Sequence, residues 1–211
     1  VHRNDGGGVF TPMPSVSLLP AGQTGFEFTT ADMNGDGIAD LVVSHNAVVS
    51  GVDTLVGFDV HTGDGLGGFT VTSSQPIDAA NRIVRKVSCV DLDVDGDLDV
   101  TLFCTGTVLF AGPQGEIHNH YATNAGGFLT VDAIPLGVGQ IAFPDMQHLD
   151  GIVTDLDGDG RPDFAVAGWW NLASGAGSAL TVHLGANVVG TPYVSIVSGD
   201  QQIEYPGQPY A

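Results

Sequence analysis

The chain has 211 residues, a formal net charge of −19 and five Lys and Arg residues, so it carries too little positive charge to bind nucleic acid. It contains no apolar run of about 18 residues, the length that a membrane-spanning helix requires. With 31 Gly, 11 Pro and 43% apolar residues, the composition favours short strands joined by turns. The sequence therefore predicts an all-β protein.

The first predicted element is an outer strand in residues 1–20, which opens on a marker that recurs along the chain. The marker is a His followed by a Gly-rich turn and an aromatic residue, as in His2 to Phe10. Its four copies, the last one fainter, begin at His2, His61, His120 and His183. Because an acidic loop recurs in step with the marker, we expect an array of similar units of about 60 residues.

Each unit is predicted to hold four antiparallel strands. The first runs into the acidic loop, the second leaves it as an apolar run such as Leu41–Val43, the third carries the His of the marker, and the fourth begins near the aromatic residue. Repeated four-stranded units of this length are typical of β-propeller blades. The predicted divisions are the orphan outer strand 1–20, blade 1 at 21–78, blade 2 at 79–136, blade 3 at 137–199 and a C-terminal tail at 200–211.

The predicted architecture is thus three full blades plus an extra N-terminal strand. Three blades are fewer than the roughly four to eight that close a propeller ring. Either the chain is cut from a larger propeller, or copies of it complete one another. In the second case the unpaired strand from Phe10 to Leu18 would add to the edge of a neighbouring molecule.

The acidic loop repeats three times with the same spacing of side chains. Carboxylates or an amide stand at positions 1, 3, 5 and 9, Gly stands at position 6, and the residue at position 7 can offer its backbone carbonyl. Alternate residues of a tight loop turn their oxygens toward one point, as a hard cation requires. The candidate ligands are Asp32, Asn34, Asp36, Ile38 and Asp40; Asp91, Asp93, Asp95, Asp97 and Asp99; and Asp155, Asp157, Asp159, Arg161 and Asp163.

Twelve of the 24 acidic residues lie within these loops. Crowded carboxylates repel one another, so we expect folding and cation binding to be coupled. Three Ca²⁺ ions are predicted, because Mg²⁺ demands a tighter octahedron and the position-12 Glu of an EF-hand is missing. The alternative is a set of Asx turns that satisfy their own backbone. Calcium loops of modest affinity suit extracellular calcium, so a secreted or cell-surface protein is expected.

Three other residue sets have a structural and a functional interpretation. The periodic histidines are expected to pack or turn rather than to bind zinc. Cys89 and Cys104 flank the second loop and could form a disulfide or remain buried thiols. Trp169 and Trp170 follow the third loop on one strand, where one ring is expected in the core and the other is a candidate ligand or assembly surface.

The D-x-[DN]-x-D-G-x-x-D loop before an apolar strand, with N-D-G-G-G-V-F at 4–10, resembles FG-GAP/VCBS repeats, the blades of integrin-α-like β-propellers. The resemblance extends from Asn4 to about Ser198 and implies calcium binding at the matching loop positions. Asn34 replaces an Asp, and the last marker is weakened to Pro192-Tyr193. Some calcium-rich propellers of polysaccharide lyases look similar.

The sequence contains no nucleophile and base pair, phosphate loop or zinc motif, so no catalysis is expected. The predicted function is an extracellular, calcium-binding, non-catalytic repeat module that acts as a scaffold or adhesion surface and self-assembles through its unpaired end strand. The expected partners are calcium and further copies or blades, with an extracellular protein or glycan as a further possibility. The alternative is a carbohydrate-binding module, or the non-catalytic part of a polysaccharide-degrading enzyme, that uses Trp169 or Trp170.

Overall fold

The computed structural model describes residues 2–13, 18–49, 51–79, 82–106, 115–123, 127–130, 134–135, 146–172, 175–183 and 203–205. Within these ranges every regular element is a β-strand, and all strand pairs are antiparallel. No helix in the described ranges is long and apolar enough to cross a membrane. The prediction of an all-β protein is therefore confirmed.

Three antiparallel sheets follow one another along the chain, and in each the strands pair in chain order. The first contains β3 (Thr24–Ala31), β4 (Asp40–Val49), β5 (Val52–Gly63) and β6 (Phe69–Ala79). The second contains β7 (Arg82–Val90), β8 (Asp99–Gly106), β9 (Gly115–Thr123) and β10 (Gly127–Thr130), with β11 (Ile134–Pro135) also on β9. The third contains β12 (Met146–Thr154), β13 (Asp163–Leu172), β14 (Gly175–His183) and β15 (Ile203–Tyr205).

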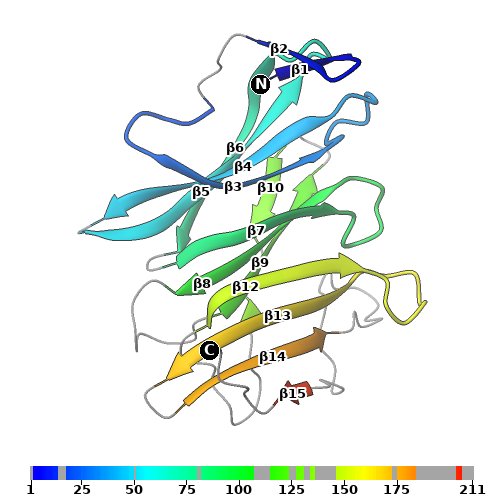
Figure 1. Ribbon diagram of the computed structural model, residues 1–211. Helices are drawn as coiled ribbons and strands as arrows, with labels where there is room; N and C mark the ends of the chain where they lie inside the picture. The colour runs from blue at the N-terminus through cyan, green and yellow to red at the C-terminus, as the bar shows by residue number, and fades with distance from the viewer. Residues whose placement is uncertain are drawn as a thin grey trace.

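The three sheets are stacked face to face in chain order (Figure 1), with β3 against β7 and β12 against β8. Between the first two sheets lies the main apolar core, where Val42, Phe58 and Val60 meet Val100 and Leu102. Continuous apolar runs appear in β4 and β8 because both faces of these strands are covered. This stacking of four-stranded sheets is the arrangement that the predicted blades require, although a closed ring is not present.

The second and third sheets are joined by aromatic packing. The rings of Phe103 and Phe164 meet edge to face with centroids 6.4 Å apart. Residue 151 has to be Gly, because a Cβ there would lie 2.4 Å from the Phe103 ring. Lys86 Nζ also donates to Asp150 Oδ1 across 2.9 Å, although both side chains are partly exposed and such a pair contributes little to stability.

A separate hairpin of β1 (His2–Gly6) and β2 (Val9–Pro12) precedes the first sheet. It carries the first copy of the marker, which in β5–β6 and β9–β10 forms the last two strands of a four-stranded sheet. All residues of the hairpin are exposed, including Val9 at 58% and Phe10 at 59%. The predicted outer strand 10–18 is therefore shorter, ending at Pro12, while residues 14–17 lie outside the described ranges.

Other strands are longer than the apolar runs predicted. β4 continues through Ser44, His45 and Asn46, which are buried although polar, because backbone pairing with β5 persists beyond the apolar residues. The fourth strand of the third sheet is β15, which lies in the segment that the sequence analysis assigned to a tail. The strand predicted near Tyr193 lies outside the described ranges.

Cys89 and Cys104 are both free thiols. Cys89 lies opposite Val100 in the β7–β8 ladder, whereas Cys104 lies opposite Val84, so the two side chains are several residues apart along the sheet. A disulfide needs Cα atoms within about 7 Å, which this register does not allow. Burial raises the pKa of Cys89 to about 12, so its thiol is inert as a nucleophile.

Candidate metal centre

Each acidic loop joins the first strand of a sheet to the second, so all three occupy the same place in their sheets. The first connects β3 to β4, the second connects β7 to β8, and the third connects β12 to β13. The first two also line one groove of about 550 Å³ between their sheets, to which Asp32, Asn34 and Asp97 contribute. The loops therefore gather at one edge of the stack rather than being scattered over the molecule.

The carboxylate at position 1 closes each loop by accepting two backbone N–H groups. Asp91 Oδ1 accepts from Asp95 (3.0 Å) and Asp91 Oδ2 accepts from Gly96 (2.9 Å), and Asp32 bonds its loop in the same way. Asp155 accepts from Gly158 and Gly160 instead. The Gly at position 6 has φ of +83°, +101° and +86° in the three loops, a left-handed conformation that favours glycine.

The carboxylate at position 5 accepts the N–H of position 7 in every loop, at 2.8, 2.9 and 2.8 Å. The donors are Ile38, Asp97 and Arg161. This bond fixes the peptide that follows Gly and holds the backbone of position 7 against the loop. Ile38, Asp97 and Arg161 entered the candidate set through their carbonyls, so their unlike side chains do not affect that role.

The carboxylate at position 9 is fully buried and connects the loop to a distant strand. Asp99 Oδ2 accepts the N–H of Leu92 in its own loop (2.7 Å), and Asp99 Oδ1 accepts the N–H of Ala122 at the end of β9 (2.7 Å). Asp40 does the same with Met33 (3.0 Å) and Gly63 (2.9 Å). Both Gly63 and Ala122 follow the marker His by two residues, which explains why marker and loop keep step. In the third loop Asp163 accepts from Leu156 (2.7 Å).

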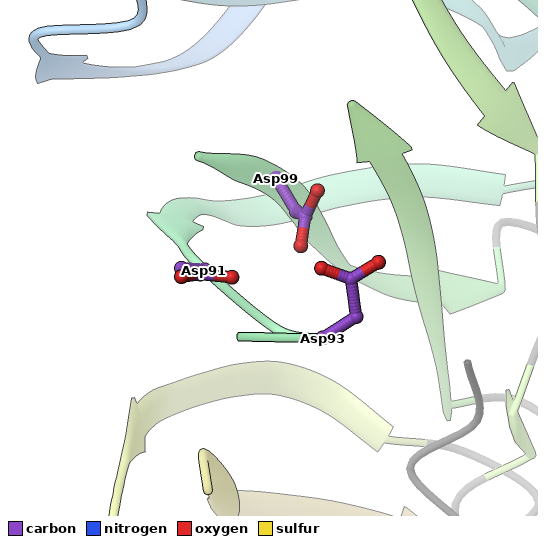
Figure 2. Close-up of side chains that lie close together, drawn as sticks. All are labelled: Asp91, Asp93 and Asp99. Atoms are coloured by element: carbon purple, nitrogen blue, oxygen red, sulfur yellow. The ribbon is translucent and has the colours of Figure 1, made fainter. Parts of the chain in front are cut away.

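The second and third loops bring three carboxylates together (Figure 2 for the second). One oxygen of each of Asp91, Asp93 and Asp99 lies within 4.8 Å of the others, and the same holds for Asp155, Asp157 and Asp159. The first loop has the amide of Asn34 at position 3, which donates to Asp36 Oδ2 across 3.0 Å. The second loop therefore gathers positions 1, 3 and 9, whereas the third gathers positions 1, 3 and 5.

The second loop carries the clearest electrostatic signature of a cation site. Burial, followed by the charge of Asp95, raises the pKa of Asp93. Burial also raises the pKa of Asp99 to about 6, against the hydrogen bonds from Ala122 and Leu92 that lower it. Asp93 Oδ1 is buried and has no hydrogen-bond partner. Carboxylates that are disfavoured as free anions in this way are stabilised by a cation between them.

Position 4 of the second loop is strained. Gly35 and Gly158 occupy this position in the other two loops with positive φ, whereas the second loop has Val94 at φ +63°. A β-branched residue in this region is a genuine outlier, and such strain is found preferentially at functional sites. The sequence analysis overlooked this feature, although the glycines in the two related loops are its signal.

The marker histidines differ in their surroundings. His61 and His120 are buried, and His120 packs edge to face on Phe58 with ring centroids 5.1 Å apart. Burial lowers the pKa of His120 to about 4, so it is neutral at physiological pH. His2, in the hairpin, is exposed. For His183 only the backbone pairing with Phe164 is described.

Trp169 and Trp170 lie on β13, where their backbones pair with Ser178 and Gly177 of β14. Their side chains lie outside the described part of the structure, so a ligand or assembly surface at these residues remains a prediction.

A buried ion-pair network at the opposite end of the second sheet was not predicted. Arg82 Nη2 donates to Glu116 Oε1 (2.7 Å), Arg82 Nε donates to Glu116 Oε2 (3.0 Å), and His118 Nε2 lies 3.1 Å from the same Oε2. Burial acts to raise the pKa of Glu116, but the hydrogen bonds from His118 and Arg82 outweigh it and hold the pKa at about 2. The residues are 34 positions apart, so no local pattern announces them.

Comparison with known proteins adds one finding. Residues 1–43 match the FG-GAP-like repeat family, from the hairpin through β3 and the first acidic loop into β4. No curated protein and no solved structure matches the chain. The matched segment contains both the marker and the loop on which the resemblance to this family was based. The chain therefore carries an FG-GAP-like repeat at residues 1–43, and the predicted family is confirmed there.

Proposed function

We propose that the protein is an extracellular, non-catalytic repeat module of the β-propeller type whose three acidic loops bind calcium and thereby hold its sheets together. The observation that carries this proposal is the shared construction of the loops. Each joins the same two strands, closes on its position-1 carboxylate and is tied to its sheet by a buried position-9 carboxylate. Three identical placements are expected of structural clips, whereas a catalytic site occurs once.

The donors present fit a hard divalent cation. They are carboxylate, amide and backbone oxygens, with no sulfur or imidazole in the loops, which is the ligand chemistry that Ca²⁺ prefers. Asp93 Oδ1, buried without a partner beside Asp91 and Asp99, is the kind of oxygen that an ion would satisfy. In the second loop Asp91, Asp93, Asp95 and Asp99, with the carbonyl of Asp97, would hold the ion. It would supply positive charge and no reaction.

The number of ions bound tests the proposal directly. Isothermal titration of the chelator-treated chain with Ca²⁺ is expected to give three sites per chain. The double substitution Asp91→Ala and Asp93→Ala should reduce this number to two, because it removes two ligands from one loop while leaving the other loops intact. Asp64→Ala, which removes an exposed carboxylate of the β5–β6 turn, should leave three. A chain that takes up no calcium would contradict the proposal.

A second candidate property, self-assembly, is favoured by the β1–β2 hairpin. In the first and second sheets the strand that carries the marker His is paired on both edges, whereas β1 has a partner on one edge only within the described residues. An open strand edge is a template for pairing with another chain. The exposed Val9 and Phe10 would be covered in such a contact. The occupant that we propose is a second copy, in which a pair of inner strands meets β1.

Sedimentation of the calcium-loaded chain tests self-assembly. The wild type is expected to form oligomers that dissociate on dilution, and Phe10→Lys should shift the distribution to monomer because it places a charge in the contact. Leu66→Lys is the matched control, since Leu66 is 75% exposed on the turn of the β5–β6 hairpin, and it should have no effect. A wild-type chain that is monomeric at every concentration would rule out this contact.

A further inference from the structure

A second set of metal-ligating side chains lies in the first sheet, away from the acidic loops. His45 on β4 and Asp59 and His61 on β5 are all buried, with exposed fractions of 7%, 3% and 1%. In the β4–β5 ladder Val43 lies opposite Asp59, and Leu41 lies opposite His61. Because side chains alternate across a strand, the three side chains share one face of the sheet.

That face is turned away from the second sheet. The opposite face carries Val42 and Val60, which belong to the core between the first two sheets. On the face with the histidines, His61 is hydrogen-bonded to the backbone of Leu18, in the segment that connects the hairpin to β3. The three polar side chains therefore lie at the junction between the first sheet and the segment that precedes it.

These side chains have very few hydrogen bonds for their burial. Both ring nitrogens of His45 and Nε2 of His61 are buried without a partner. Buried polar groups are nearly always satisfied, and exceptions point to an absent water or ion. His45 Nε2 and Asp59 Oδ1 are 3.4 Å apart yet not hydrogen-bonded to each other. Two ligands of one tetrahedral zinc ion, each about 2.0 to 2.2 Å from the metal, are roughly 3.3 to 3.5 Å apart.

His61 has the protonation pattern of a metal ligand. Since Nε2 is the ring nitrogen without a partner, the bond to Leu18 is made by Nδ1, which donates to the backbone carbonyl. Metal-ligating histidines commonly donate their second ring N–H to a carbonyl or carboxylate, which leaves the lone pair of the other nitrogen free. In His61 this free lone pair is on Nε2, on the same face as Asp59.

We propose that His45, Asp59 and His61 form a binding site for a transition-metal ion, with Zn²⁺ as the best match to two imidazoles and one carboxylate. The three donor atoms do not all lie within 4.8 Å of one another, so one imidazole turns on binding. Three protein ligands leave the fourth position of the ion for a water or an external donor. The site fastens the segment at Leu18 to the first sheet and is independent of the calcium loops.

The second sheet shows why the site is confined to the first. The equivalent positions there, each 59 residues further on, are Cys104, His118 and His120. His118 is occupied by Glu116, and His120 is packed edge to face against Phe58 of the first sheet. The second set lacks the carboxylate that Asp59 supplies, and its face is filled by the core. This difference makes His120 a natural control for His61.

The test is metal binding by the full chain in excess Ca²⁺, which keeps the acidic loops filled with a hard cation. Equilibrium dialysis with Zn²⁺ is expected to give one zinc per chain. His45→Gln and Asp59→Asn should each weaken zinc binding at least 100-fold, whereas His120→Gln should leave it unchanged. No zinc uptake by the wild type, or equal uptake by all variants, would overturn the proposal.

A measurement on the wild type alone keeps the proposal testable even if the variants unfold. With Co²⁺ in place of Zn²⁺, tetrahedral coordination by nitrogen and oxygen gives intense visible absorption, and addition of Zn²⁺ should abolish it. The weak spectrum of octahedral Co²⁺ bound only to oxygen would instead assign the ion to an acidic loop and overturn the proposal.

Discussion

Removal of calcium is expected to lower the melting temperature of the chain by about 15 to 30 °C. A ligand that binds only the folded state, at a free concentration 100-fold above its dissociation constant, stabilises by about 2.7 kcal/mol per site, and so by about 8 kcal/mol for three independent sites. For a domain of this size each kcal/mol changes the melting temperature by roughly 2 to 4 °C. The 12 acidic residues of the loops add to the effect, because without the ions they repel one another.

Thermal unfolding followed by circular dichroism, with and without chelator at constant ionic strength, measures this effect. Constant ionic strength is needed because a net charge of −19 makes the stability sensitive to any salt. Mg²⁺ at the same concentration is the control, and it should restore only part of the loss, since it keeps its waters and demands a stricter geometry. An unchanged melting temperature would mean that the loops are Asx turns without an ion.

The repeat explains how much of this fold could be predicted from the sequence. The spacing of Asp32 and Asp91, together with the marker at His61 and His120, placed the strands of the first two sheets because each repeat confirms its neighbour. The same reasoning was less successful in the third sheet. There the fourth strand, β15, lies at Ile203–Tyr205, because pairing with β14 depends on contacts distant in sequence.

Interactions that cross between units were beyond the sequence analysis for the same physical reason. The Arg82–Glu116 ion pair and the approach of Gly151 to Phe103 join residues that no local pattern relates. The polar side chains of His45 and Asp59 were hidden in another way, since polar residues in a strand are normally assigned to an exposed face. Their burial follows from the stacking of sheets, which a single strand does not encode.

The candidate site was predicted more completely than the role of its parts. Spacing identified positions 1, 3, 5 and 9 as equivalent ligands, but position 9 differs from the others in the structure. Asp40, Asp99 and Asp163 are fully buried and accept backbone N–H groups, so they serve the sheet whether or not an ion is present. The equal separation of 23 residues from Asp40 to Gly63 and from Asp99 to Ala122 was the available signal.

Asp99→Ala is therefore expected to destabilise the chain by about 2 to 6 kcal/mol, because it leaves the N–H groups of Leu92 and Ala122 without an acceptor and each buried unsatisfied donor costs about 1 to 3 kcal/mol. Asp97→Ala is the matched control. It removes a carboxylate from the same loop, but Asp97 is exposed and only its backbone contributes to the loop. A change within about 0.5 kcal/mol is expected there.

Urea unfolding of both variants, measured in calcium and again in chelator, separates the two roles of Asp99. If the carboxylate ties the loop to β9, the loss persists in chelator, because hydrogen bonds from Leu92 and Ala122 need no ion. If Asp99 acts only as a ligand, the difference between variant and wild type disappears once calcium is removed. The same comparison at Asp40, which bonds Met33 and Gly63 in the first loop, should give the same result, since the first two loops are built on the same pair of hydrogen bonds.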